Sequence, residues 1–514
     1  MKTPLLTIMI AAMTLLPRLS QADPAALYQQ NCQQCHGVDR MGGMGPALLP
    51  ESLDRLKPAE VADTIRHGRR ATQMQGFAGK LAEADILSLA GYLNTPPAQP
   101  PHWQEADMLA SHKQVVDEAR LPAKPVFSAN PMNLFVVVEA GDHHVTIMDG
   151  DTFKPISRFA SHYALHGGPK FSPDGRFVYF ASRDGWVTQY DLYSLQVVAD
   201  IRVGLNTRNL AVSDDGKWVL AGNTLPATLV LLDAHGLKPV RTYPVASQTG
   251  KPSRVSAVYE AAPRHSFIVA LKDVPELWEI PYNTPAERVR PRLAHGQHSG
   301  KAPAAASALN PIVTSLDMVL DDFFFDPAYR HVLGASRDGR AEVISLDSHR
   351  KVRDLALGGM PHLGSGITFE QGGHRYMATP NLKGGQVTFV DMDSWQVVKN
   401  INLPGPGFFL RSHENTPYAW ADSMMSAHKD TLTIIDKRTM SVARQLVLRP
   451  GLTTAHVEFT RDGRYALVSV MQNPGELIVV DAQTFAEVAA LPMMKPIGKY
   501  NVFNKVHRSE GTSH

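Results

Sequence analysis

Residues 171–201 read FSPDGRFVYFASRDGWVTQYDLYSLQVVADI. They contain, in order, an Asp-Gly turn, a strand, a second turn, a strand that ends in aspartate, a third turn and a last strand. The same order returns in VSDDGKWVLAGNTLPATLVLLDAHGLKPVRTY (212–243) and in FTRDGRYALVSVMQNPGELIVVDAQTFAEVAAL (459–491). Short apolar runs separated by turn residues are typical of antiparallel β-strands. The stretch is therefore one unit of an internal repeat.

The strand-ending aspartate marks this repeat along the chain. Most of its intervals are 42 to 45 residues, but the interval from 233 to 347 is too long for one unit, and ELWEIPYN (276–283) fits a missing copy that has lost its aspartate. Eight β-rich units of this length predict an all-β eight-bladed β-propeller. Residues 284–310 break the period and are predicted to be an exposed insertion. The aspartates are Asp149, Asp191, Asp233, Asp347, Asp391, Asp436 and Asp481.

A domain of another kind precedes the repeat. Cys32 and Cys35, the two cysteines of the chain, lie in the motif CQQCH, which ends in His36. This motif is typical of covalent c-type haem attachment, in which the thiols bond the haem and the histidine binds its iron. Helices are predicted in DPAALYQQN before the motif and in LAEADILSLAGYL after it. Residues 23–95 therefore resemble a small all-α class I cytochrome c domain.

Such cytochrome domains usually supply a methionine as the second iron ligand. Met74, in RRATQMQGF just before the last helix, holds the matching place. Met41 and Met44 are the alternatives, but they follow His36 by only five and eight residues, from where a return to the opposite haem face is awkward. A thioether ligand suits iron of high potential and predicts a one-electron carrier.

The N-terminus and the composition bound the rest of the chain. Lys2 precedes an apolar stretch over 5–16 that is too short to span a bilayer, so residues 1–22 are predicted to be a cleaved signal peptide. We therefore expect export to the periplasm and no membrane span. A Pro-rich break leads into a predicted linker, 96–127, and the propeller follows over 128–514. The net charge of +2, without a basic run, excludes nucleic acid as a partner.

A propeller brings the innermost strands of its blades together around one axis. Residues just before the first turn of each unit are therefore expected to share one face. Three histidines and two arginines have such positions, and their coincidence favours a site for an anionic, iron-bearing ligand. They are His166, Arg208, Arg254, His362 and His456.

A haem c domain followed by an eight-bladed propeller resembles the cytochrome cd1 nitrite reductase family. YALHGGPKFSPDGRFVYFASRDG is similar to the family stretch whose histidine binds the iron of haem d1, which implies His166 as the proximal ligand. GGMPHLGSGITF is similar to the stretch with a distal histidine, here His362. GLNTRNLAVS and KPSRVSAV resemble segments whose arginines meet the haem d1 carboxylates, which implies Arg208 and Arg254. GKYNVFN (498–504) resembles the closing strand of the family.

One departure from that family bears on function. Its nitrite reductases carry a second distal histidine, but MVLDDFFFDPAYRHVL has none near that point, where Asp321 or a neighbour stands. An aspartate is anionic at neutral pH, so it would repel nitrite and impair proton delivery to it. CHGVDRMGGMGPALLPESL is more similar to the related NirN-type proteins, which are periplasmic cytochromes of haem d1 biosynthesis. That resemblance implies a dehydrogenase that forms the acrylate of haem d1.

The implied reaction removes two electrons and two protons from a propionate of dihydro-haem d1. Haem c would take the electrons one at a time and pass them to an external acceptor. His166 and His362 would bind the two faces of the substrate iron, so His456 is free to be the base, because a neutral imidazole accepts a proton near pH 7. Tyr500, on the closing strand, is predicted as the second catalytic group, and His413 is a weaker candidate.

Two other functions are open at this stage. One is a cytochrome cd1 nitrite reductase, and the other is a carrier that binds haem d1 without chemistry. A transient complex with nitrite reductase or with another haem d1 assembly protein is also expected.

Overall fold

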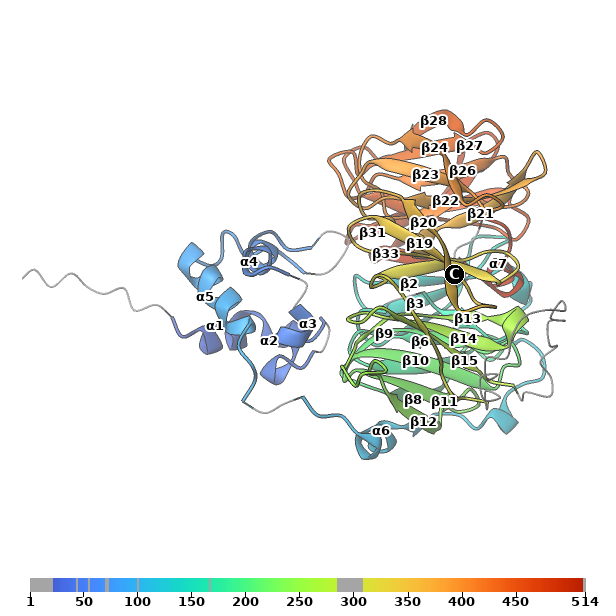
Figure 1. Cartoon of the computed structure of the whole chain (residues 1–514). Helices are drawn as coiled ribbons and strands as arrows, with labels where there is room; N and C mark the ends of the chain where they lie inside the picture. The colour runs from blue at the N-terminus through green and yellow to red at the C-terminus, as the bar shows by residue number, and fades with distance from the viewer. Residues whose placement is uncertain are drawn as a thin grey trace, which may run out of the picture.

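Eight antiparallel sheets arranged as the blades of a propeller make up most of the molecule (Figure 1). The structure is a computed structural model, and it describes residues 22–42, 45–53, 56–69, 74–98, 101–165, 168–283 and 308–511. The predicted eight-bladed propeller is confirmed, and the missing fourth copy corresponds to the strand Glu276–Pro281. The predicted signal peptide and nearly all of the predicted insertion lie outside the described residues.

Each blade has four strands that follow one another from the propeller axis outward. The innermost strands are β33 (Pro496–Asn501), β5 (Lys170–Phe171), β9 (Asn206–Val212), β13 (Val255–Ala261), β17 (Asp322–Phe325), β21 (Ile367–Gln371), β25 (Leu410–Arg411) and β29 (Thr454–Phe459). The second strands are β2 (Leu134–Glu139), β6 (Phe177–Ala181), β10 (Trp218–Leu225), β14 (Ser266–Leu271), β18 (His331–Ala335), β22 (His374–Pro380), β26 (Tyr418–Asp422) and β30 (Tyr465–Val470).

The outer half of each blade is more exposed than the inner half. The third strands are β3 (His144–Asp149), β7 (Trp186–Asp191), β11 (Thr228–Asp233), β15 (Glu276–Pro281), β19 (Arg340–Ser345), β23 (Gln386–Asp391), β27 (Thr431–Asp436) and β31 (Gly475–Asp481). The outermost strands are β4 (Pro155–Ala160), β8 (Gln196–Arg202), β12 (Pro239–Pro244), β16 (Ile312–Ser315), β20 (Arg350–Ala356), β24 (Gln396–Asn402), β28 (Ser441–Val447) and β32 (Glu487–Met493). The apolar core lies between neighbouring blades, where Leu220 of β10 and Val269 of β14 pack in one cluster.

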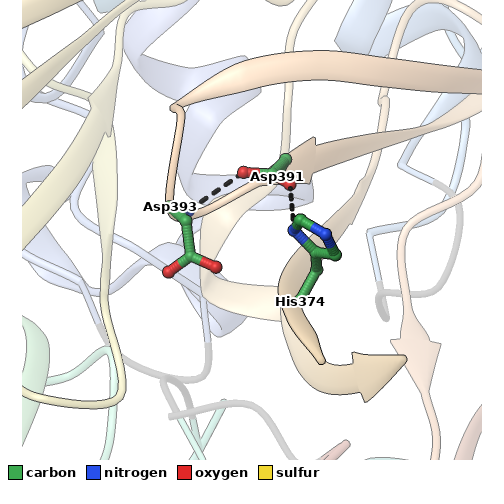
Figure 2. A group of neighbouring side chains, drawn as sticks. All are labelled: His374, Asp391 and Asp393. Carbon is green, nitrogen blue, oxygen red and sulfur yellow. Dashed lines mark hydrogen bonds and ion pairs between the residues drawn. The ribbon is translucent and has the colours of Figure 1, made fainter. Parts of the chain in front are cut away.

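The repeated aspartate has a structural role at the end of the third strand. Asp391 ends β23, and one of its carboxylate oxygens accepts a hydrogen bond of 3.0 Å from the backbone N–H of Asp393 (Figure 2). An aspartate that accepts the N–H two residues later forms a local turn, and this bond recurs at the end of the third strand in six of the eight blades. The preceding Asp-Gly turn uses glycine because its φ lies in the left-handed region, as at Gly175 with 72°.

The last strand of the chain closes the propeller. β33 pairs with β2, so the first blade combines strands from both ends of the propeller sequence. Its register places Tyr500 opposite Val136 and Lys499 opposite Val137. The expectation that the closing strand returns to the first blade is confirmed.

The N-terminal domain is a small set of helices around its own core. The helices are α1 (Pro24–Asn31), α2 (Gln33–His36), η1 (Val38–Arg40), α3 (Pro50–Leu53), α4 (Pro58–His67) and α5 (Glu83–Leu93). Leu27, Ile65 and Leu89 are buried in the core that α1, α4 and α5 share. The two predicted helices that flank the CQQCH motif correspond to α1 and α5.

The N-terminal domain packs on the third and fourth blades. Ala47 and Leu49 bury their side chains against Leu205 and Leu225, which lie in the third blade or just before it. The segment expected as a linker contains α6 (Glu105–Ser111), η2 (Glu118–Arg120) and β1 (Lys113–Gln114), and β1 extends the second blade by pairing with β8. This segment therefore lies along the propeller. In the described part of the chain, no helix is long and apolar enough to cross a membrane.

The C-terminal segment covers the end of the axis opposite the N-terminal domain. α7 (Val502–His507) lies on the far side of the propeller from α1 to α5 (Figure 1). Asn504 donates to the carbonyl of Phe459, and Arg508 donates to Glu260. The N–H of Gly511 donates to the carbonyl of Thr368. The N–H of Ser412 in turn donates to the carbonyl of Gly511, so the segment contacts at least four blades and lies at the end of the axis away from the N-terminal domain. The remaining short helices are η3 (Pro131–Asn133), η4 (Ala262–Arg264) and η6 (Leu363–Ser365).

The role of the repeated aspartate can be tested at Asp481. Its carboxylate accepts hydrogen bonds from the backbone N–H groups of Gln483 and Thr484 and from the Thr484 hydroxyl. Asp481→Ala should lower the free energy of unfolding of the propeller by about 1–2 kcal/mol, because these turn donors lose their acceptor. The measurement is the Tm of the propeller transition. Gln483→Ala, at an exposed position of the same turn, is the control and should not move it. Equal Tm values for the two variants would contradict this role.

Candidate functional site

Every blade contributes one polar side chain to a ring around the propeller axis. Each side chain comes from an innermost strand or, in the sixth blade, from the turn before it. We call this set the axial ring. Its members are Lys170 (β5), Arg208 (β9), Tyr259 (β13), Asp322 (β17), His362 (before β21), Arg411 (β25), His456 (β29) and Tyr500 (β33). The structure thus brings together Arg208, His362 and His456, which the sequence analysis had placed on one face, and adds Tyr500, which it had placed on the closing strand.

Direct contacts and charge interactions connect the members of the axial ring. The Tyr259 hydroxyl donates to Asp322 at 2.9 Å, and Lys170 Nζ lies 5.7 Å from the Tyr259 ring centroid. The His456 and Tyr500 rings meet edge to face with centroids 5.3 Å apart. The charges of Asp322 and the two ring arginines all act on His362. The eight residues therefore form one electrostatic environment.

The orientation of His362 leaves one ring nitrogen available as a ligand. Nδ1 donates to the backbone carbonyl of Phe408 at 2.7 Å, and the Phe408 ring packs against the imidazole with centroids 4.2 Å apart. Burial lowers the pKa of His362, so the imidazole is neutral at pH 7. Because a carbonyl only accepts, the proton is on Nδ1 and Nε2 keeps its lone pair. This is the state of a histidine that binds a metal.

Asp322 supports the turn that carries His362. Its Oδ2 accepts a hydrogen bond of 2.8 Å from the Gly364 N–H, two residues after the histidine. Asp322 follows Asp321 in the fifth blade, near the point where the sequence analysis found no second distal histidine. Asp321 itself pairs with Arg337 at 3.4 Å.

Cations outnumber acids among the side chains near the axis. Burial removes solvent from these cations and lowers their pKa values. Burial lowers the pKa of Lys170 to about 8 and that of Lys505, which lies over the Tyr500 ring, to about 7. Burial and the charge of Arg208 lower the pKa of Arg183 to about 9. Clustered, desolvated cations favour an anionic ligand, because carboxylates restore the lost solvation and cancel the repulsion. The residues therefore fit a ligand with several carboxylates.

His456 is buried and its outer ring nitrogen lacks a protein partner. In the described part of the chain no donor or acceptor contacts His456 Nε2. The Phe409 ring, at 4.5 Å between centroids, and the Tyr500 ring enclose the imidazole. Burial lowers the pKa of His456 well below its usual value, and the charge of Lys499 acts in the same direction. A neutral imidazole with a bare polar atom can accept a proton from a ligand.

Arg254 connects the two domains. Its guanidinium binds Asp273 with two hydrogen bonds, of 2.9 Å from Nε and 2.6 Å from Nη2. Nη1 donates to the backbone carbonyl of Glu51 in the N-terminal domain. The predicted role of Arg254 toward a haem d1 carboxylate stays a prediction, and Arg208, which lies inside the axial ring, is the better placed of the two arginines.

The N-terminal domain presents a histidine in the same state as His362. His36 Nδ1 donates to the carbonyl of Pro46 at 2.8 Å, and burial lowers the pKa of the imidazole, so Nε2 keeps its lone pair. Gly45 lies against the ring, where a Cβ would come within 2.6 Å of Cε1. Cys32 and Cys35 are half-buried on the same short helical segment. These residues fit a covalently attached haem c.

The positions of the methionines favour Met74 as the second ligand of haem c. Met74 is half-buried against the core that contains Leu27 and Ile65. Met41 packs instead in the cluster between the domains, against Leu205. Met44 lies outside the described residues. Met74 stays a prediction, and its place in the haem c domain agrees with it.

Two other predicted residues have different outcomes. His166 lies outside the described residues, so its role as proximal ligand stays a prediction. His413 lies toward the C-terminal segment: its Nδ1 accepts the Asn415 N–H at 3.1 Å, and the neighbouring Ser412 N–H donates to Gly511. The structure therefore separates His413 from the axial ring.

A further group of polar side chains lies away from the axis, on an exposed hairpin of the sixth blade. His374, Asp391 and Asp393 bring their ligand atoms within 4.8 Å of one another (Figure 2). Asp391 already accepts the turn N–H groups, and Asp393 pairs with Arg375 at 3.1 Å. These hydrogen bonds and the ion pair explain why the three side chains lie close together: they stabilise the turn between the third and fourth strands of the blade.

Comparison with known proteins agrees with this site. Residues 129–303 and 304–505 match the Cytochrome D1 heme domain family, and residues 20–93 match the family of subunit III of cbb3-type cytochrome c oxidase. The chain is 55% identical to the dihydro-heme d1 dehydrogenase of Pseudomonas aeruginosa over 97% of this chain and 98% of that protein. This chain belongs to the dihydro-heme d1 dehydrogenase family.

Two further matches place the family in context. The solved structure of dihydro-heme d1 dehydrogenase NirN in complex with DHE has a TM-score of 0.81 and 55% identity, and the match covers 94% of this chain and all of that one. The nitrite reductase of Stutzerimonas stutzeri is 23% identical over 94% of this chain and 92% of that protein. The predicted relationship to NirN-type proteins and to cytochrome cd1 is confirmed.

Four members of the axial ring escaped the sequence analysis. Lys170 and Arg411 lie before the first turn of their units, as the predicted histidines do. This position could have identified them as members of the axial ring. In the seventh blade the sequence analysis considered His413 and overlooked Arg411, which lies two residues before it. Tyr259 and Asp322 gave no signal beyond strand position, because tyrosine and aspartate are common in strands and turns.

The second ligand of haem c can be tested with Met74 and Met41, the two candidate methionines that the structure describes. Met74→Ala should leave the haem attached, because the thiols and His36 are unchanged, and should lower the haem c reduction potential, because a thioether ligand raises it. Met41→Ala is the matched control and should leave the potential near that of the wild type. The measurement is a spectroelectrochemical titration of haem c. A drop in potential for Met41→Ala alone would assign the ligand to Met41.

Proposed function

We propose that this chain oxidises a propionate of dihydro-haem d1 to the acrylate of haem d1 and passes the electrons to its covalent haem c. Membership of the dihydro-heme d1 dehydrogenase family makes it an oxidoreductase of haem d1 biosynthesis. The observation that carries the proposal is the axial ring, in which a histidine prepared to bind iron, a set of desolvated cations and a neutral histidine with a bare nitrogen occur together.

Substrate binding rests on opposite charges and on iron coordination. We assign His362 to one face of the substrate iron and His166 to the other. Two axial histidines leave no coordination position for nitrite, which suits oxidation of the macrocycle side chain. Arg208, and with it Lys170 and Arg411 from other blades of the axial ring, would pair with the ring carboxylates.

The protons leave through residues on the eighth and first blades. His456 is the proposed base, because burial lowers its pKa and Nε2 has no protein partner in the described part of the chain. Burial raises the pKa of Tyr500 to about 12, so the phenol stays protonated and donates a hydrogen bond to the substrate side chain. The two groups are in ring contact and can act on adjacent carbons.

Haem c supplies a one-electron acceptor next to the propeller. The haem c domain lies against the third and fourth blades, and Arg254 holds the Glu51 carbonyl at this contact. We propose that an external acceptor then reoxidises haem c. We also propose that the chain works in the periplasm after removal of residues 1–22, and that it forms transient complexes with nitrite reductase or other haem d1 assembly proteins.

The two arginines give a test of substrate binding. Arg208→Gln should weaken binding of dihydro-haem d1 by roughly 10-fold to 100-fold, because a charge-assisted hydrogen bond contributes about 1.5–3 kcal/mol. Arg254→Gln is the matched variant and should weaken binding less, because its guanidinium is bonded to Asp273 and Glu51. Spectral titration of each variant gives the Kd. A larger loss for Arg254→Gln would exchange the two roles.

The proposed chemistry is tested at His456. His456→Ala should slow single-turnover oxidation of bound dihydro-haem d1 by about 100-fold or more, because a positioned base contributes that much to proton transfer. His413→Ala removes another buried histidine, outside the axial ring, and should oxidise the substrate at a rate close to that of the wild type. The reduction of haem c gives the rate. If His456→Ala keeps the wild-type rate, the residue is not the base.

A further inference from the structure

The loop between β24 and β25 presents the backbone carbonyl to which His362 donates. This loop, residues 403–409, reads LPGPGFF and enters the seventh blade. Its last residue, Phe409, accepts the N–H of Asp422 on its carbonyl at 3.3 Å. Gly407 lies so close to the carbonyl group of Asp422 that a residue with a Cβ would collide with it. The loop is therefore packed directly against the end of β26.

The buried carboxylate of Asp422 accepts three backbone N–H groups. Oδ1 accepts from Phe408 at 2.9 Å and from Met424 at 3.1 Å, and Oδ2 accepts from Phe409 at 2.8 Å. Burial raises the pKa of Asp422 to about 6, and the three N–H groups and the charge of Arg411 act in the opposite direction. The carboxylate is therefore mostly anionic at pH 7.

One peptide group connects this carboxylate to His362. The peptide between Phe408 and Phe409 donates its N–H to Asp422 Oδ2, and its C=O accepts the Nδ1 proton of His362 at 2.7 Å. The N–H and the C=O of a trans peptide point in opposite directions, and hydrogen bonds in such a chain polarise one another. A negative charge at the N–H end thus makes the carbonyl a stronger acceptor for the imidazole.

We propose that Asp422 is a positioning residue that orients His362 through this peptide and makes its Nε2 a stronger ligand for the substrate iron. This rests on the proposed function, in which His362 binds that iron. A carboxylate bonded directly to a histidine ligand fixes the ring and raises its basicity. Asp422 acts in the same sense from one peptide away.

The consequence of a more basic ligand is a lower reduction potential of the iron, because such a ligand stabilises the oxidised state. An iron of low potential does not retain the electrons that leave the substrate side chain. They pass instead to haem c, whose predicted methionine ligand raises its potential. The contact of Asp422 therefore supports the direction of electron transfer in the proposed function.

A second acid, Asp322, also supports His362 but by a different path. Its Oδ2 accepts the N–H of Gly364, so it holds the backbone that follows the histidine. Its charge acts on the imidazole across the axial ring. Asp422 instead acts along the hydrogen bond that fixes the tautomer of His362. The two acids thus have separate contacts, and a change at Asp422 leaves that of Asp322 in place.

The test uses the holoprotein with haem c, loaded with haem d1, the product of the proposed reaction, so that no side chain is oxidised during a redox titration. Asp422→Asn removes the charge and places an amide NH2 group opposite a backbone donor, and Asp422→Ser is a smaller neutral variant. Each should raise the reduction potential of the haem d1 iron and leave that of haem c unchanged. The absorption spectrum should stay that of the wild-type complex, because His362 is still present.

Two further variants serve as references. Asp436→Asn is the matched control, because Asp436 also accepts a backbone N–H in the seventh blade, from Arg438 at 2.8 Å, but lies outside the axial ring. It should move neither potential. His362→Ala gives the spectrum of a complex that has lost this iron ligand.

Three outcomes would overturn the proposal. If both Asp422 variants keep the wild-type potential of haem d1, the charge does not reach the iron. If they show the spectrum of His362→Ala, Asp422 only holds the loop. If His362→Ala itself keeps the wild-type spectrum, the histidine is not a ligand. Failure of the proposed dehydrogenation has a different signature, because the wild-type protein would then leave dihydro-haem d1 unoxidised, whatever the potentials of the haem d1 complexes.

Discussion

The pairing of β33 with β2 is the contact on which the site depends. It joins the end of the propeller sequence to its beginning, so that eight blades enclose one axis. Its register directs Tyr500 to the axial ring and Lys499 to the backbone carbonyl of His456. A shift of one residue would exchange the faces of the strand and place the lysine where the phenol lies. Closure of the fold therefore also brings Tyr500 and Lys499 to His456.

Electrostatics explain why this axis suits a tetrapyrrole with several carboxylates. Lys170, Arg183 and Lys505 all have lowered pKa values because burial removes their solvation. Such buried cations destabilise the protein when no ligand is bound. A ligand with several negative charges removes this destabilisation. Meanwhile His362 is held neutral, with its proton committed to the Phe408 carbonyl. In the proposed function, these charges attract the carboxylates and the neutral histidine binds the iron.

Much of this arrangement could be predicted from the sequence, and the exceptions have physical reasons. The repeated aspartate revealed the blades because six of the seven close the same local turn, and CQQCH revealed haem c because the spacing of the motif is local. Lys499 could not be found in this way. Its contact with the His456 carbonyl depends on a register shift between β29 and β30 and on the register of the closing strand, neither of which leaves a local pattern. Arg254 occupies a predicted ring position, but a contact between domains engages its guanidinium.

The most direct test of the account is anaerobic mixing of the oxidised protein with half an equivalent of dihydro-haem d1, so that two haem c groups are available for the two electrons of each substrate molecule, followed by the absorption spectrum of the mixture. The account predicts that haem c becomes reduced as the spectrum of dihydro-haem d1 changes to that of haem d1, with both changes at one rate. Return of unchanged dihydro-haem d1 from a protein whose haem c stays oxidised would contradict it and identify a carrier.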